Sequence, residues 1–251
     1  SAKGKHLGHV GLGNRKDIRN AVEAAHAAKG WGKATGHNRA QILYYMGENL
    51  SARAGEFAQR IKDQTGREGA AEVEAAINRL FTYAAWAGKF DGAVKQVPMR
   101  AVALAMNEPV GVIGALCPDE VPLLGFVSVM APAIAMGNTC VLVPSQSAPL
   151  SATDFYQVLE TSDLPAGVVN IVTGAHHDLA KPLAGHLDVD AVWSFSTAPL
   201  SAQIETEAAG NLKRTWVNHG RARNWFGAEG EGREFLRHAT EIKTIWVPYG
   251  E

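Results

Sequence analysis

The amino-acid sequence predicts an α/β fold in which a doubly wound parallel sheet carries N-terminal helices and a small antiparallel β-flap. Three observations lead to this prediction. Residues 1–98 have helical periodicity, residues 108–220 alternate apolar strand-like runs with helices, and two further strand-like segments find no place in that alternation. A chain of 251 residues with 46% hydrophobic and 20% charged residues has an ordinary globular composition and can bury a sizeable core.

Helical signals dominate the N-terminal residues. Asn14 can cap a helix whose apolar residues recur at three- and four-residue intervals from Ile18. A second helix is predicted from Asn38 to the stop signal at Gly66, and a third over residues 68–90. Because these segments precede the first convincing strand, we expect residues up to 98 to pack as helices on the core that follows.

The periodicity changes to two at residues 100–106, where alanine alternates with larger apolar residues, and this pattern predicts a β-strand. Apolar runs and helices then alternate regularly. Such alternation builds a parallel sheet with right-handed crossovers, which is the Rossmann-like, doubly wound architecture. The predicted strands are 110–117, 139–143, 168–172, 191–195 and 214–218, and the predicted helices follow Leu123 and Pro149, surround Leu179 and follow Leu200.

The C-terminal residues predict a polar link and a last strand. We expect residues 221–235 to form a glycine-rich link, and residues 236–251 to pair with residues 99–107 as an antiparallel flap outside the Rossmann-like core of 108–220. An unpaired flap edge can accept a strand of another chain, so we expect self-association or a protruding hairpin. The predicted interface residues of the flap are Val102, Leu104, Met106, Ile242, Thr244 and Trp246.

Charge and cysteine content exclude several classes of partner. With 24 basic and 25 acidic residues the formal net charge is −1, so neither nucleic acid nor a membrane surface is an expected partner.

The most apolar stretch, 122–136, is shorter than the ~20 residues of a membrane span and predicts a buried helix. Two cysteines in apolar runs suit a reducing compartment, and we expect cytoplasmic localisation. Because the chain begins at Ser1 and not at methionine, we expect a piece of a longer polypeptide.

Glycine- and proline-containing motifs mark the strand–helix alternation. They are Asn-Glu-Pro-Val-Gly-Val-Ile-Gly (107–114), Ala-Pro-Ala (131–133), Gly-Asn-Thr (137–139) and Leu-Pro-Ala-Gly-Val-Val-Asn-Ile-Val-Thr-Gly (164–174). In this order and spacing they resemble the nucleotide-binding domain of the aldehyde dehydrogenase superfamily. The resemblance extends to the N-terminal helices and to residues 240–250, which are similar to the C-terminal oligomerisation strand of that family.

The resemblance implies a chemistry whose parts can be sought in this chain. In the family a cysteine thiolate attacks the aldehyde, an oxyanion hole stabilises the adduct, a general base activates water and NAD accepts the hydride. The thiolate lies in a catalytic domain inserted after the Rossmann core, where this chain has only the link of 221–235. Cys117 and Cys140 fall in or beside core strands, and we expect both to be packing residues.

Two reactive positions of the family carry other side chains here. The oxyanion-stabilising asparagine corresponds to Glu120, whose carboxylate would repel a developing alkoxide. The general base corresponds to Asn218, whose amide accepts no proton from water at neutral pH. The resemblance therefore predicts that both catalytic positions are degenerate.

The cofactor-binding positions of the family are also changed. The ribose-binding lysine falls on Val143, which offers no hydrogen bond, and its accompanying acid falls on Gln146. No glycine occurs in residues 193–199, where Phe195 and Ser196 stand in the segment of the family's pyrophosphate-binding Gly-Ser pair. We therefore expect no cofactor in this chain, although NAD is the cofactor of the parent family.

Side-chain chemistry is changed throughout while the fold-determining glycines and prolines remain, so the chain looks most like the degenerate C-terminal module of aldehyde dehydrogenase family 16. We expect a pseudoenzyme, not an enzyme by itself, that serves interdomain packing and oligomer assembly. Its partner would be an N-terminal aldehyde dehydrogenase module or a second copy paired through the flap. Two alternatives remain open: an NAD-dependent oxidoreductase module that binds cofactor weakly or works with a catalytic domain from another module, and a module with a small regulatory ligand in the old cofactor cleft.

Histidine and glycine clusters are weaker signals. The two histidines and the aspartate of 176–178 point about 100° apart along a helix, so we expect a solvated helix start and no metal site. His6 and His9 have no further ligand visible in the sequence. The glycines between residues 8 and 13 follow no apolar strand and predict a turn instead of a dinucleotide fingerprint.

Overall fold

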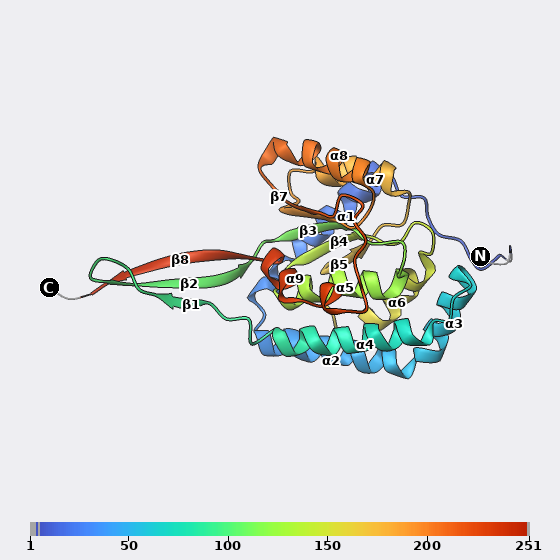
Figure 1. Cartoon of the computed structure of the whole chain (residues 1–251), viewed down its shortest axis with the longest axis horizontal. Helices are drawn as coiled ribbons and strands as arrows, with labels where there is room; N and C mark the ends of the chain where they lie inside the picture. Colours follow the sequence, from blue (N-terminus) through green and yellow to red (C-terminus); the bar gives the residue numbers. More distant parts are fainter. Residues whose placement is uncertain (1–3, 5, 250–251) are drawn as a thin grey trace.

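A helical body carries a narrow β-flap that projects from one end (Figure 1). The computed structural model describes residue 4 and residues 6–249, so Ser1 and Gly250 of the predicted chain ends lie outside the described residues. The first described residues lie at the end of the body opposite the flap. None of the described helices is both long and apolar enough to cross a bilayer.

The N-terminal residues form the helices that their periodicity predicts. Asn14 and Asp17 make a capping box at the start of the first helix, with the Asn14 side chain accepting a hydrogen bond from the N–H of Lys16. The predicted helix from residue 38 to Gly66 is broken at Arg53, whose backbone leaves helical geometry and whose guanidinium binds Glu56. The elements are α1 (Arg15–Ala27), a 3-10 turn η1 (Ala28–Lys33), α2 (Gly36–Ala52), α3 (Ala54–Thr65) and α4 (Ala70–Trp86).

A five-stranded parallel sheet forms the centre of the body, as the alternating pattern predicts. The strand order is β5-β4-β3-β6-β7, so the connections reverse direction between β3 and β6. This reversal is the topological switch point of a doubly wound sheet. The strands are β3 (Val112–Leu116), β4 (Thr139–Val143), β5 (Val169–Ile171), β6 (Ala191–Ser194) and β7 (Arg214–Val217).

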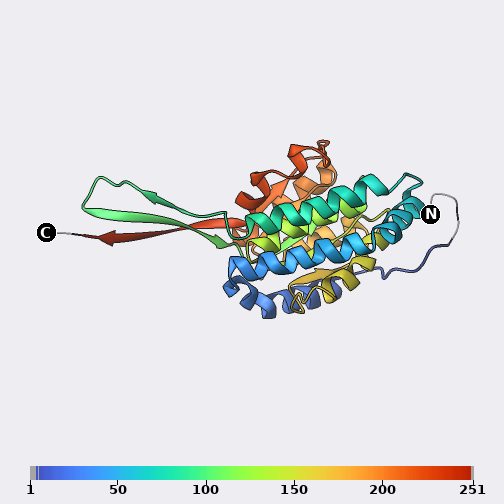
Figure 2. The same ribbon diagram turned by 90° about the horizontal axis from the view of Figure 1, so that it is seen from below.

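Helices cover both faces of this sheet. One face packs against α1 with α7 (His176–Ala184) and α8 (Ala198–Ala208), because the apolar residues of these helices share one core cluster with alternate residues of β3 and β4. The other face packs against α5 (Pro122–Ala135) and α6 (Leu150–Glu160), over which α2, α3 and α4 form an outer layer (Figure 2). Every residue of α5 is buried, as expected for a helix enclosed between the sheet and α4.

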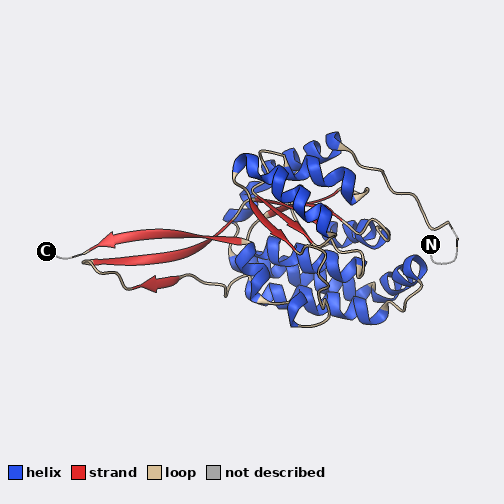
Figure 3. Cartoon of the chain, turned by 45° about the horizontal axis from the view of Figure 1, so that its top comes forward, coloured by secondary structure: helices blue, strands red, loops and turns tan. Residues whose placement is uncertain are grey.

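The flap is an antiparallel sheet of β1 (Ala93–Lys95), β2 (Ala101–Pro109) and β8 (Thr240–Pro248), and it stands clear of the helices (Figure 3). The pairing of β2 with β8 runs from Ala101 opposite Pro248 to Pro109 opposite Thr240. This confirms the predicted antiparallel flap. Strand β1 was not predicted, because its residues are all exposed and show no alternation.

The segment between β7 and β8 is more ordered than a glycine-rich link. It contains a 3-10 turn η3 (Ala228–Gly230) and a short helix α9 (Arg233–His238). Trp225, Phe235 and Leu236 are buried against the core. The sequence did not indicate these elements, because the apolar residues are separated by polar ones and follow neither period.

Candidate functional site

Loops at the carboxyl ends of β3, β4 and β6 meet at the switch point of the sheet, where doubly wound proteins bind their ligands. Asp119, after β3, ties two of these loops together. Its carboxylate accepts hydrogen bonds from Ser145 Oγ at 2.7 Å and from Gln146 Nε2 at 3.0 Å, both after β4. Although burial acts in the opposite direction, these hydrogen bonds lower the pKa of Asp119 below its ordinary value. The loop after β4 is therefore held by a charged carboxylate.

His176, the first residue of α7, ties the third loop to this network. Its backbone N–H donates to Gln146 Oε1 at 3.0 Å, and its Nε2 donates to the carbonyl of Pro144 at 2.9 Å. Its Nδ1 lies 3.4 Å from Ser196 Oγ, just after the end of β6. The prediction of a solvated helix start is wrong for His176, which is 1% exposed, since loops distant in sequence supply its partners.

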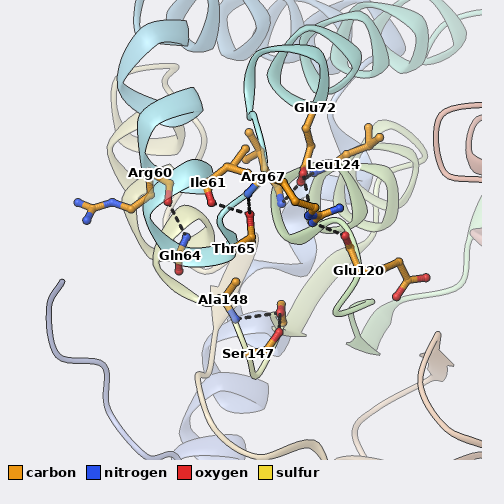
Figure 4. Close-up of polar contacts among 12 residues, drawn as sticks. Arg60, Ile61, Gln64, Thr65, Arg67, Glu72, Glu120, Leu124, Ser147 and Ala148 are labelled. Atoms are coloured by element: carbon orange, nitrogen blue, oxygen red, sulfur yellow. Dashed lines mark hydrogen bonds and ion pairs between the residues drawn. The ribbon is translucent and has the colours of Figure 1, made fainter. Parts of the chain in front are cut away.

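Glu120 anchors the segment that follows β7. Its Oε1 accepts a hydrogen bond from Trp225 Nε1 at 2.8 Å, and its backbone carbonyl accepts one from the guanidinium of Arg67. Figure 4 shows Arg67 reaching Glu120 from the turn before α4. The side chain at the predicted oxyanion position is therefore engaged in a structural contact.

Side chains of the N-terminal helices cap two helices of the core. Glu72 Oε1 accepts hydrogen bonds from the N–H groups of Leu123 at 2.8 Å and Leu124 at 3.2 Å, at the start of α5 (Figure 4). Burial raises the pKa of Glu72, and these N–H donors oppose that rise. Gln64 caps α6 in the same way, with its Oε1 2.8 Å from the N–H of Leu150. Sequence reasoning missed both caps, because each partner lies far along the chain.

Asn218, at the predicted general-base position, closes its own turn. Its Nδ2 donates to the carbonyl of Arg221 at 3.0 Å, and its Oδ1 accepts from the N–H of Gly220 at 3.2 Å. The residue between, His219, has a left-handed φ of 51°. The amide therefore directs the chain from β7 into the segment 221–235.

The side chains at the predicted cofactor positions are buried or engaged by other groups of the chain. Val143 is fully buried on β4, and both ends of the Gln146 amide are engaged by Asp119 and the backbone of residue 176. Phe195 is buried among aromatic rings, and Ser196 faces the histidine of α7. No glycine at the start of α8 allows close approach of a pyrophosphate, and Pro199 removes one N–H donor of that helix.

The two thiols are packing groups. Cys117 and Cys140 are both fully buried, one just after β3 and the other on β4. Burial raises the pKa of each thiol well above its ordinary value, which disfavours the thiolate that a nucleophile needs. Among the described residues, no three His, Cys, Asp or Glu side chains gather as metal ligands.

A groove of about 970 Å³ runs between α1, α7 and α8 on the outside of the body. An ion pair of Lys181 with Glu207, at 3.2 Å, crosses from α7 to α8 within it. The lining includes the basic side chains Arg15, Lys16, Arg19, His177, Lys181 and His186 and the acidic side chains Asp178 and Glu207.

The six predicted interface residues lie on both faces of the flap. Cross-strand register places Val102, Leu104 and Met106 on one face of β2, whereas Ile242 and Trp246 point to the other face from β8 with Thr244. Ile242 is 67% exposed and Trp246 is 50% exposed. The outer edge of β8 has no paired strand among the described residues.

The sequence model of the aldehyde dehydrogenase family matches residues 1–225. The chain belongs to this family. It is 30% identical over 227 residues to an aldehyde dehydrogenase of Agaricus bisporus, covering 87% of this chain and 45% of that relative. It is 31% identical over 222 residues to the NADP/NAD-dependent aldehyde dehydrogenase PuuC of Escherichia coli K12, covering 85% of this chain and 45% of that relative.

Solved aldehyde dehydrogenases share the fold. Betaine aldehyde dehydrogenase from Staphylococcus aureus in complex with NAD+ superposes with a TM-score of 0.79 at 26% identity, covering 83% of this chain and 43% of that one. The chain spans less than half the length of the curated relatives that it matches. These findings confirm the superfamily and the fold.

The expectation that this chain is not an enzyme is wrong. The relatives that it matches are named aldehyde dehydrogenases, which are enzymes. That expectation rested on the short link in place of the nucleophile-bearing domain and on replaced side chains such as Glu120 and Asn218, whereas the family model matches residues 1–225.

Proposed function

We propose that this chain is the Rossmann and flap module of an NAD-dependent aldehyde oxidoreductase that works with a catalytic domain supplied by another module. The arrangement would be that of aldehyde dehydrogenase family 16, in which two modules follow one another. The observation that carries the proposal is the flap, which projects from the body with apolar side chains on both faces. Its role would be interdomain packing and oligomer assembly.

The free edge of β8 supports this role. Nine consecutive residues pair with β2 on one side, and among the described residues no strand pairs on the other. An exposed edge of this length is a template for a strand of another chain, which would add main-chain hydrogen bonds and cover apolar side chains. Ile242, Trp246 and Val247 would be covered in such a pairing.

The state of the thiols supports the need for a second module. An aldehyde dehydrogenase needs an accessible thiolate, and both Cys117 and Cys140 are buried in the sheet. The nucleophile would then lie in the partner, and the cofactor would lie at the interface with it. Weak binding of NAD by this chain alone fits the engaged side chains at the switch point.

Light scattering over a range of protein concentrations tests whether the flap mediates self-association. We expect the chain to self-associate, and we expect Ile242→Lys and Trp246→Lys to reduce association. Leu187→Lys is the matched control, because Leu187 is 74% exposed and lies in the loop between α7 and β6, outside the three flap strands. A monomer at every concentration, with no change in any variant, would contradict pairing through β8.

The proposal that a second module supplies the catalytic thiol is tested on the protein isolated from its source cells. Antibodies to this chain should recover, from source cells, a polypeptide or complex that carries a catalytic thiol and reduces NAD with an aldehyde. An inhibitor that alkylates accessible thiols should abolish that activity. Recovery of this chain with no accessible thiol in the same complex would contradict the proposal.

A further inference from the structure

Arg223, in the segment after β7, inserts its guanidinium among four aromatic rings. Its Cζ lies 5.4 Å from the ring centroid of Phe195 and 5.3 Å from that of Trp216. It also lies 5.9 Å from the centroid of Trp225 and 5.5 Å from that of Phe235. All four distances are within the ~6 Å over which a cation and a ring attract each other.

These four rings form one aromatic cluster, here called the ring cage. Phe195 follows β6, Trp216 lies on β7, Trp225 lies in the segment after β7, and Phe235 lies on α9. The rings contact one another directly, with centroids 5.1 Å apart for Phe195 and Trp225 and 4.9 Å apart for Trp216 and Phe235. A cage of rings around a cation is the arrangement by which proteins recognise organic cations.

The walls of the ring cage are held by residues other than Arg223. Arg79 of α4, 1% exposed, donates hydrogen bonds to the carbonyls of Trp225 and Gly230. Glu120 accepts the indole N–H of Trp225, and Phe235 is fully buried on α9. Because these contacts are independent of residue 223, the cage should keep its shape when that guanidinium leaves.

The surroundings provide both negative charge and access. Arg223 Nη1 lies 3.1 Å from Glu234 Oε2 and also donates to the carbonyl of Glu229. These residues line a hollow of about 450 Å³ beside the cage, which also contains the cationic side chain of Arg221 and the imidazole of His219. Residues 221–224 form no helix or strand, so their withdrawal would unwind neither and would break the hydrogen bonds of Asn218 with Arg221 and of Asn224 with Glu229.

We propose that the ring cage is a binding site for a guanidinium-type organic cation and that Arg223 is its internal ligand in this state. When residues 221–224 withdraw, an external molecule that carries a planar, weakly hydrated cation takes the place of the guanidinium. The four rings supply cation–π attraction and Glu234 supplies the counter-charge. The cage borders the switch point, since Phe195 directly follows β6 and Trp225 binds Glu120 after β3, and it lies outside the flap.

The experiment removes the internal ligand and supplies an external one. Arg223→Ala is titrated with methylguanidinium at concentrations below those that denature proteins, and the indole N–H resonances of Trp216 and Trp225 are followed by NMR. We expect saturable shifts and an affinity about tenfold or more above that of the unchanged chain, a difference of about 1.4 kcal/mol. N-methylurea, which has a similar shape and no charge, should produce no such shifts.

Arg233→Ala is the matched control. Arg233 also lies over aromatic rings, 4.8 Å from the centroid of Trp86 and 5.8 Å from that of Phe90, but outside the ring cage. Its removal should leave the weak response of the unchanged chain to methylguanidinium unaltered. A gain of binding in this variant equal to that in Arg223→Ala would overturn the assignment to the cage.

Failure of Arg223→Ala to fold still leaves the proposal testable. Binding to the folded state stabilises it by mass action, so methylguanidinium should then restore the folded spectrum and N-methylurea should not. Arg223→Gln provides a second variant with the same expectation. No saturable binding and no restoration in either variant, or equal effects of the neutral analogue, would overturn the proposal.

Discussion

The indole Nε1 of Trp225 donates a hydrogen bond to Glu120 Oε1 over 2.8 Å. This contact joins the loop at the carboxyl end of β3 to the segment that follows β7, although the two residues are far apart in the sequence. At a position where family resemblance assigns an oxyanion donor, the chain thus has an acceptor that holds its own segment in place. The contact gives a direct test of how firmly that segment is attached.

Removing the Glu120 carboxylate should weaken this attachment. Glu120→Ala leaves the indole N–H of the buried Trp225 without its acceptor, which costs about 1 kcal/mol of unfolding free energy. Glu120→Gln keeps an acceptor oxygen and should cost less. Urea denaturation measures both, and a double-mutant cycle with Trp225→Phe isolates the pair. Additive effects of Glu120→Ala and Trp225→Phe would contradict a direct contribution of this hydrogen bond.

The hydrogen bonds from Glu72 to the start of α5 should contribute more to the free energy of unfolding than the Glu120–Trp225 hydrogen bond, because Glu72 is buried. Glu72→Ala leaves the N–H groups of Leu123 and Leu124 without a side-chain acceptor, and we expect a loss of about 2 kcal/mol of unfolding free energy. Glu72→Gln retains an acceptor oxygen and should be milder. Glu74→Ala, an exposed glutamate of the same helix, is the control. Equal losses at residues 72 and 74 in urea denaturation would show that the cap adds nothing.

Because Asp119 is charged in the folded state, the free energy of unfolding should fall when the pH is lowered into the acidic range. Because its folded-state pKa is lowered, the stabilisation is complete above the unfolded pKa of about 4 and is lost as the pH falls through the folded-state value. The difference in unfolding free energy between the unchanged chain and Asp119→Asn should therefore be larger at about pH 6 than at about pH 3. A difference that stays constant over this range would count against a charged network at the switch point.

Lys213 should produce a dependence of the same sign in the alkaline range, because its folded-state pKa is also lowered. Burial lowers its pKa to about 8, against the opposing influence of Asp190 and Asp188. Folding disfavours the charged amine, so stability should rise as the pH increases from about 8 toward the unfolded value of about 10.4. Thermal unfolding of Lys213→Met should lack this rise, whereas the exposed control Lys243→Met should retain it. An unchanged alkaline profile in Lys213→Met would contradict the prediction.

Most of the fold could be predicted from the sequence, because its signals are local. Glycine and proline mark the helix ends, and the apolar run of 139–143 coincides with β4. Helix α9 and the burial of Trp225 could not be predicted, since single apolar residues among glycines show no period. Nor could the partners of His176 or Glu72 be predicted, because a hydrogen bond between distant residues leaves no pattern in the chain.

The candidate site was less predictable than the fold. Resemblance located Glu120, Gln146 and Asn218 at the ends of core strands, and the structure places them there. Their side chains nevertheless bind one another's loops or their own turns, which residue type alone does not reveal.

Enclosure of α5 between the sheet and α4 has a consequence for how this chain can be divided. The helix is apolar around its whole circumference, and the carboxylate that satisfies its first N–H groups belongs to residue 72. Cutting the polypeptide between α4 and β2 would expose the apolar surface of α5. It would also remove the Glu72 carboxylate that accepts hydrogen bonds from the first N–H groups of α5, so the two fragments should aggregate unless they reassociate. The helices up to α4 and the Rossmann-like core that contains α5 should therefore be kept together in any fragment that is to fold.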